Sequence, residues 1–137
     1  YIGLGLGASG FINGVRYKNT SDLEEYLSAL NEGRLPVAEE YINTAFDNIS
    51  EAVFTGLRRR EGIRYEDAVR AYMEADDAEK SDISTCACKD FFWNVFAEAE
   101  DEAREYAERG LLIIDNEGLK LTEQGIDISN SIMSLFV

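Results

Sequence analysis

YIGLGLGASGFINGVRYKN, the stretch from Tyr1 to Asn19, joins an apolar run to a hairpin signal. Its first part, Tyr1–Ala8, is apolar and rich in glycine, which predicts a strand in the middle of a sheet with both faces buried. No second run of this kind follows to pair with it in parallel, so we expect the sequence to begin inside a larger fold. Asn13-Gly14 then lies between short apolar flanks and predicts a β-hairpin over Phe11–Tyr17, because both residues tolerate positive φ.

A helix is predicted directly after the hairpin. Ser21-Asp-Leu-Glu24 has the spacing of a capping box. Gly33 and Pro36 end the helix, and residues 31–43, mixed in charge and holding the only proline, are predicted to form a linker. Four apolar residues share one face of the helix: Leu23, Tyr26, Leu27 and Leu30.

The remainder of the chain reads as mainly helical. We predict helices from Thr44 to Arg60, over about 65–75 and over about 88–109, a loop over 76–84, a hairpin over 111–122 and a closing helix from Thr122 or Glu123. This order predicts a mainly α (α+β) chain, with a winged-helix-like domain over 44–137 and a strand, hairpin and helix arm over 1–43. The predicted core comprises Phe46, Val53, Leu57, Phe92, Phe96, Leu112, Ile132 and Phe136.

Composition excludes several classes of function. The net charge of the 137 residues is −14, and a surface this acidic repels phosphates, which argues against nucleic acid or an anionic membrane as partner. Histidine is absent, so the usual general base and the commonest metal ligand are missing. No apolar run approaches the roughly 20 residues of a membrane span. Two cysteines are too few for a disulfide framework, which favours a cytoplasmic location.

Two motifs invite a binding interpretation. Gly5-x-Gly7-x-x-Gly10 spells a dinucleotide fingerprint, but a hairpin signal follows it where a helix is required, so close approach of another segment or a ligand to a buried strand is the better interpretation. Cys86-x-Cys88 could be half of a metal site, yet no other cysteine or histidine exists to complete it. Buried structural cysteines are favoured; a lone axial ligand and an intermolecular bridge remain as alternatives.

Two charged runs have simpler interpretations. The acids from Glu98 to Glu108 are typical of a solvated helix face, since they lack a chelating loop. Arg58-Arg59-Arg60 could bind an anion such as a propionate, but bases also suit the carboxyl end of a helix.

The chain resembles the oxygen-independent coproporphyrinogen III oxidase family, which includes haem chaperones. Tyr1–Asn19 is similar to the segment where that family's radical S-adenosylmethionine barrel ends, and the Asn-Gly-Val-Arg-Tyr form looks closer to the haem-chaperone branch. Glu51-x-x-Phe-x-Gly-Leu-Arg-x-x-x-Gly-Ile63 resembles the opening of the carboxyl-terminal domain, and Leu119-x-Leu-Thr-x-x-Gly125 resembles its closing hairpin and helix.

The resemblance implies a carboxyl-terminal piece whose first 43 residues finish the barrel. The parent protein would use a [4Fe–4S] cluster and S-adenosylmethionine, with a cysteine trio upstream, and would handle a porphyrinogen or haem. It also implies that Gly5, Gly7, Ala8 and Ser9 lie near bound S-adenosylmethionine or tetrapyrrole; no catalytic or metal-binding residue is expected in this piece. We further expect the amino-terminal arm to pack on its own domain or to self-associate. The rival hypothesis is a stand-alone acidic winged-helix module that binds a basic protein.

Overall fold

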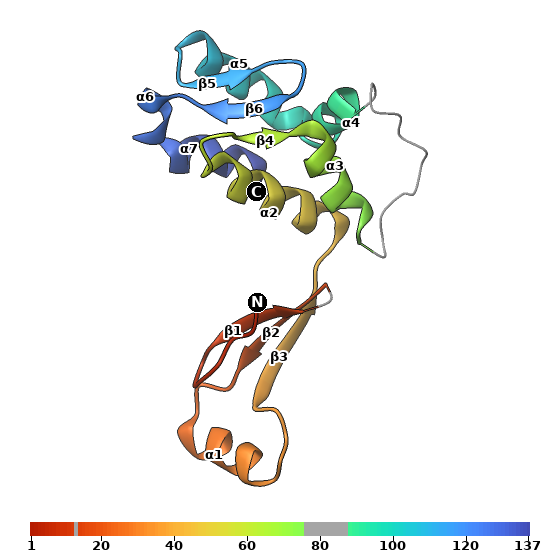
Figure 1. Ribbon diagram of the computed structural model, residues 1–137, viewed down its shortest axis with the longest axis vertical. Coiled ribbons are helices and arrows are strands. Elements are labelled where there is room, and N and C mark those ends of the chain that lie inside the picture. The colour runs from red at the N-terminus through yellow and green to blue at the C-terminus, as the bar shows by residue number, and fades with distance from the viewer. Residues whose placement is uncertain (13, 76–87) are drawn as a thin grey trace. The chain divides into compact units, whose positions relative to one another are not determined.

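The chain divides into two compact units, Tyr1–Asn43 and Thr44–Val137, in a mixed α/β fold (Figure 1). The structure, a computed structural model, describes residues 1–12, 14–75 and 88–137. Within these described residues, no helix is long and apolar enough to span a membrane.

The first unit contains a three-stranded antiparallel sheet and one helix. Strands β1 (Ser9–Ile12) and β2 (Val15–Asn19) form the predicted hairpin, with Ile12 opposite Val15. The turn contains Gly14 at φ 80°, a conformation that favours glycine, while Asn13 lies outside the described residues. The predicted hairpin is therefore confirmed.

The predicted linker is wrong, because residues 31–43 contain strand β3 (Val37–Ile42). This strand pairs antiparallel with β2 and completes the order β1-β2-β3. Most of its side chains are exposed, and two adjacent glutamates interrupt the apolar alternation that normally identifies a strand. Backbone pairing with β2, which is not visible in the composition, determines its structure.

The predicted buried strand over Tyr1–Ala8 is also wrong. Residues 5–7 form a turn, and the segment before it doubles back along β1, where the Tyr1 and Phe11 backbones exchange two hydrogen bonds, of 2.9 and 2.8 Å. Leu4 is 86% exposed. Pairing here is antiparallel and local, and the apolar side chains are left on the surface.

Helix α1 (Leu23–Asn31) has Asp22 as its N-cap, whose carboxylate accepts the backbone N–H of Glu25 at 2.8 Å, so the cap lies one residue after the predicted Ser21. The predicted apolar residues do lie on this helix, yet most of them are on the surface. Among the described residues of the first unit, Ala29 is the only buried hydrophobic residue. The exposed members of the stripe are Leu23, Leu27 and Leu30.

The second unit places helices around a small antiparallel sheet (Figure 1). Helix α2 (Ala45–Leu57) begins with the predicted Thr44 cap, which forms a reciprocal capping box with Asp47. The sheet order is β4-β6-β5. The remaining elements are β4 (Ile63–Arg64), α3 (Tyr65–Met73), α4 (Cys88–Val95), η2 (Ala97–Ala99), α5 (Glu100–Glu108), β5 (Leu112–Ile114), β6 (Gly118–Leu121), α6 (Glu123–Ile126), α7 (Ser129–Met133) and η3 (Ser134–Phe136).

Two predicted helices are broken in the structure. The helix over 88–109 is interrupted at Phe96, where φ −107° and ψ 40° leave the helical region, and the short 3₁₀ segment η2 precedes α5. The closing helix is interrupted at Ile128, where φ is −115°. In both places the apolar spacing continues across the break, so periodicity alone could not locate it.

The second unit has a continuous aromatic core. Phe92 and Phe136 are completely buried, and Trp93 and Phe96 pack with them through ring contacts of 4.9–6.4 Å between centroids. The predicted core is confirmed with one exception: Phe46 is 45% exposed, although its ring still lies 5.7 Å from Phe96. Apolar residues from α2, α3 and the sheet complete this core.

Candidate functional site

The four site residues expected from the family resemblance lie in one turn and the start of β1. The N–H of Gly7 donates to the Thr20 carbonyl at 2.8 Å, and the N–H of Ala8 donates to the Gly5 carbonyl at 3.3 Å. Ser9 is the first residue of β1. The amides of Gly7 and Ala8 are thus engaged by the protein itself, and of the four residues only Gly5 faces the groove described next.

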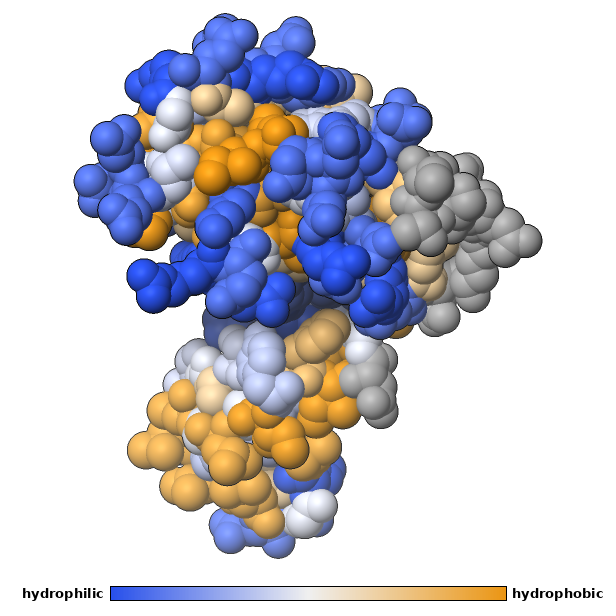
Figure 2. All heavy atoms as spheres, turned by 45° about the horizontal axis from the view of Figure 1, so that its top comes forward, coloured by the Kyte–Doolittle hydropathy of each residue, from blue (hydrophilic) through white to orange (hydrophobic). Residues whose placement is uncertain are grey.

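An apolar groove of about 590 Å³ lies beside this turn, in the size range of small-molecule sites. Its floor comes from the sheet and its rim from the first residues of the chain, α1 and the segment before β3. The lining residues are Ile2, Gly3, Leu4, Gly5, Ile12, Val15, Tyr17, Asn19, Tyr26, Leu30, Leu35, Pro36, Val37 and Glu40. Figure 2 shows apolar side chains gathered on the surface of this unit.

Tyr17 and Asn19 hold the glycine-rich segment at the edge of the groove. The Gly3 N–H donates to the Tyr17 hydroxyl at 3.0 Å, and the Asn19 amide donates to the Gly5 carbonyl at 2.9 Å. The ring of Tyr17 reaches Gly3 by crossing Gly10, where an added Cβ would overlap the ring. The glycine pattern predicted that another segment or a ligand approaches the backbone closely, and here the Tyr17 side chain does so at Gly10.

The opposite face of the same sheet has a different chemistry. Arg16 donates to the Tyr1 hydroxyl at 3.1 Å, and its guanidinium lies 5.5 Å from the centre of the Phe11 ring. Because side chains alternate along a strand, Arg16 and Lys18 project away from the face that Val15 and Tyr17 occupy. The groove therefore lacks the cations of β2.

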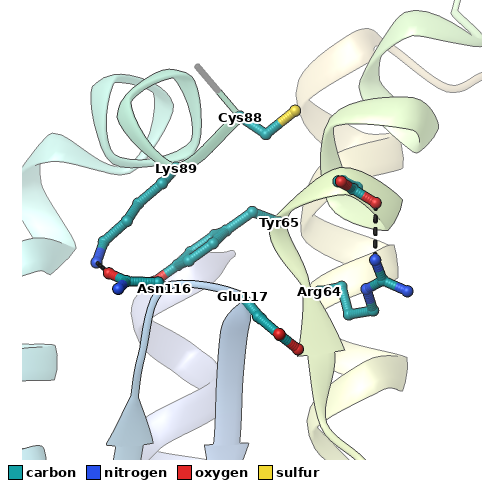
Figure 3. Close-up of a pocket in the computed structure, with 7 residues that line it drawn as sticks. Arg64, Tyr65, Cys88, Lys89, Asn116 and Glu117 are labelled. Carbon is teal, nitrogen blue, oxygen red and sulfur yellow. Dashed lines mark hydrogen bonds and ion pairs between the residues drawn. The ribbon is translucent and has the colours of Figure 1, made fainter. Parts of the chain in front are cut away.

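The second unit carries a polar pocket of about 440 Å³ (Figure 3). The Tyr65 ring crosses it, Lys89 from α4 donates to Asn116 at 3.0 Å, and Arg64 pairs with Glu66 at 2.8 Å. Burial raises the pKa of the Tyr65 hydroxyl, so this phenol stays protonated at neutral pH. Arg64 and Glu66 neutralise each other in this pocket, and the Tyr65 ring packs against Phe92 at 5.1 Å between centroids, so we treat Tyr65 as a packing residue.

The two cysteines of the chain are fewer than an iron–sulfur cluster site needs. Cys88 is buried in the core of the second unit, as predicted for a structural thiol, and Cys86 lies outside the described residues. An iron–sulfur cluster needs about four thiolate ligands, and the chain contains two cysteines. The residues present therefore do not fit the cluster expected in the parent protein.

Two features of this site were missed from the sequence. The groove depends on β3, which was predicted as a linker, and on the exposure of residues predicted to be buried. Eleven of the fifteen large hydrophobic residues exposed in the described chain lie within Tyr1–Asn43. One feature of the sequence could have predicted this exposure: the first 43 residues are rich in apolar side chains but too few to bury them in a core of their own.

Comparison with known proteins supports the resemblance. No protein-family model matches the chain. The chain is 27% identical over 138 residues to the heme chaperone HemW of Lactococcus lactis subsp. lactis, and 26% identical over 137 residues to the heme chaperone HemW of Bacillus subtilis. Each match covers 100% of this chain and 31% of the relative, so the chain spans under a third of the length of these proteins.

A solved structure shows the same fold. The coproporphyrinogen III oxidase HemN of Escherichia coli, a radical SAM enzyme, matches 97% of this chain with a TM-score of 0.72, at 20% sequence identity and over 27% of its own length. The chain is thus a homologue of part of the heme chaperone HemW, and its resemblance to a carboxyl-terminal region of the oxygen-independent coproporphyrinogen III oxidase family is confirmed.

Proposed function

We propose that this chain acts as the carboxyl-terminal part of a longer radical SAM-type protein that handles a tetrapyrrole, and that the groove of the first unit contacts the macrocycle. The observation that carries the proposal is the concentration of exposed apolar side chains around that groove. A unit with Ala29 as its one buried hydrophobic residue, among those described, has a surface suited to an apolar partner. The relatives named as heme chaperones supply the chemical class of that partner.

The cofactors of the parent protein belong to the same proposal. A [4Fe–4S] cluster and S-adenosylmethionine would supply radical chemistry when bound, on residues other than the two cysteines of this chain. Gly5, Gly7, Ala8 and Ser9 remain candidates for a contact with S-adenosylmethionine or the tetrapyrrole. Their contribution would be a backbone surface that a ligand can approach closely, because the amides of Gly7 and Ala8 already have partners.

We propose that the second unit is a winged-helix-like domain and that it covers the substrate end of the barrel in the parent protein. We expect the parent protein to work in the cytoplasm. The support is the order of its elements: helix, short strand, helices, then a hairpin whose strand β6 pairs with the early strand β4. DNA binding is disfavoured because residues 61–137 carry nineteen acids and seven bases. The exposed acids of α5 favour the second candidate function, a module that binds a basic protein.

Titration with haemin tests the proposed function directly. We expect the 137-residue chain to shift the haemin Soret band with saturable, one-to-one stoichiometry. Leu4 and Leu35 line the groove and are 86% and 81% exposed, so replacing them does not disturb a core. The double variant Leu4→Glu/Leu35→Glu should therefore fold normally and bind haemin at least tenfold more weakly.

Ile126→Glu is the matched control. Ile126 is also a large exposed hydrophobic residue, at 58%, but it belongs to α6 of the second unit. The Ile126→Glu variant should bind haemin with the affinity of the unmodified chain. Equal weakening by the control and the double variant would show non-specific adsorption, and a chain that leaves the Soret band unchanged would favour the basic-protein candidate.

A further inference from the structure

The groove lining contains one charged residue, and it is an acid. Among the described residues that line the groove, Glu40 of β3 is that residue, and it faces Tyr17 across the sheet. The nearest bases of the sheet, Arg16 and Lys18, project from the opposite face because side chains alternate along β2. Arg34, the third base of the first unit, is paired with Glu32 at 2.8 Å. A ligand carboxylate would meet no matching cation inside the groove.

The groove also offers few groups that bind iron. Residues 1–43 contain no histidine, cysteine or methionine, which are common axial ligands of haem iron. The Tyr17 hydroxyl and the Asn19 amide are occupied in holding Gly3 and Gly5. The side-chain oxygens outside these contacts are the Tyr26 hydroxyl, the Glu40 carboxylate and the amide oxygen of Asn19, and the remaining surface is aliphatic or backbone.

From these two observations we propose that the groove binds a tetrapyrrole by its carboxylate-free edge, with the carboxylates in solvent and without a bond to iron. The inference rests on the proposed function and specifies its ligand. A macrocycle with two neighbouring propionates, such as protoporphyrin IX, has an apolar edge that can enter. Coproporphyrin III carries a propionate on every pyrrole ring, so any edge that enters the groove brings a carboxylate with it.

Placing that carboxylate in the groove should cost binding free energy. A carboxylate placed in an apolar site without a partner must either lose its hydration or take up a proton. Glu40, an exposed acid on the groove lining, adds repulsion against a ligand carboxylate. The affinity of a tetrapyrrole for the groove should therefore depend on its number of carboxylates and not on its metal.

Three probes test the inference with the 137-residue chain: haemin, metal-free protoporphyrin IX and coproporphyrin III. We expect haemin and protoporphyrin IX to bind within about threefold of each other and coproporphyrin III at least tenfold more weakly, at pH 7.5. Binding of coproporphyrin III as tight as that of protoporphyrin IX would overturn the carboxylate rule. If none of the three binds, the proposed function itself fails, which is a separate outcome.

Charge reversal in β3 provides the sharper comparison. Glu40→Lys places a cation on the groove lining and should strengthen coproporphyrin III binding at least fivefold, while protoporphyrin IX changes by less than twofold. Glu39→Lys is the matched control, because Glu39 is the neighbouring exposed acid, faces Lys18 and is not part of the groove lining. An equal gain in both variants would show that overall charge, and not the groove, sets the selectivity.

The iron claim has its own test. The bound haemin should lack the charge-transfer absorbance of a tyrosinate ligand, and the ratio of its affinity to that of protoporphyrin IX should be the same in the unmodified chain and in Tyr26→Phe. Haemin binding at least tenfold tighter than protoporphyrin IX, with the advantage lost in Tyr26→Phe, would overturn that part of the inference and make Tyr26 an axial ligand.

Discussion

Replacing Phe136 by alanine removes a ring at the centre of the aromatic core of the second unit. The side chain is completely buried, and its ring centre lies 5.2 Å from that of Phe96, 6.0 Å from Phe92 and 6.4 Å from Trp93. Phe136 is part of the continuous buried core, and a close-packed interior relaxes only partly around a deleted side chain. A cavity should remain.

The loss combines two contributions. Burying a phenylalanine side chain contributes about 1.5–3 kcal/mol, and the cavity raises the cost of a Phe→Ala change to about 3–5 kcal/mol. Phe46→Ala is the matched control, because Phe46 touches the same core at Phe96 but is 45% exposed. About half of its surface never leaves water, so we expect a loss of about 1 kcal/mol.

Urea and thermal unfolding followed by far-ultraviolet circular dichroism will measure both values. For a unit of this size about 1 kcal/mol corresponds to roughly 4–8 °C in Tm, so Phe136→Ala should lower Tm by at least about 12 °C. The fluorescence of Trp93, the only tryptophan, gives a second probe inside the core. Equal losses for the two variants would mean that the described packing of Phe136 and Phe46 is incorrect.

Three further substitutions test the second unit in other ways. Gly125→Ala should destabilise it by about 1–3 kcal/mol, since an added Cβ would overlap the Leu111 carbonyl oxygen; chemical denaturation checks this, and a neutral result would contradict the close approach. Asp115 accepts two backbone N–H groups in the β5–β6 turn at 2.7 and 2.9 Å, which lower its pKa. Asp115→Ala should therefore cost about 0.5–1 kcal/mol at pH 7, allowing for solvent screening. That difference should disappear as the pH falls through the lowered pKa of Asp115, and a difference that persists in acid would refute the carboxylate's role. Ser50→Ala should raise stability by about 0.5–1 kcal/mol, because the buried Ser50 hydroxyl has no hydrogen-bond partner among the described residues, and a drop in Tm would reveal a missed partner.

Local signals in the sequence were reliable where short-range chemistry decides the structure. Thr44 has a capping hydroxyl with Asp47 three residues later, and the helix begins there. The hairpin at Gly14 follows from positive φ, and the β5–β6 hairpin follows from a turn at Asp115–Gly118. None of these features depends on distant residues.

The failures share a physical cause, because each depends on what a segment packs against. Glu39 and Glu40 made β3 look like a linker, yet an edge strand needs only backbone pairing on one side. Leu4 belongs to an apolar run that suggested burial, but the first unit has little core to receive it. The groove could not be predicted for the same reason: it exists because those side chains stay exposed around β3.

The most direct test of the account is a map of where a tetrapyrrole contacts the chain. In ¹H–¹⁵N correlation spectra of the 137-residue chain, diamagnetic zinc protoporphyrin IX should shift amides that line the groove, including those of Gly5, Tyr26 and Leu35, in a saturable manner. Amides around Tyr65 and Lys89 in the second unit should not move. Shifts confined to that polar pocket, or no saturable shifts at all, would contradict a tetrapyrrole-contacting groove in the first unit.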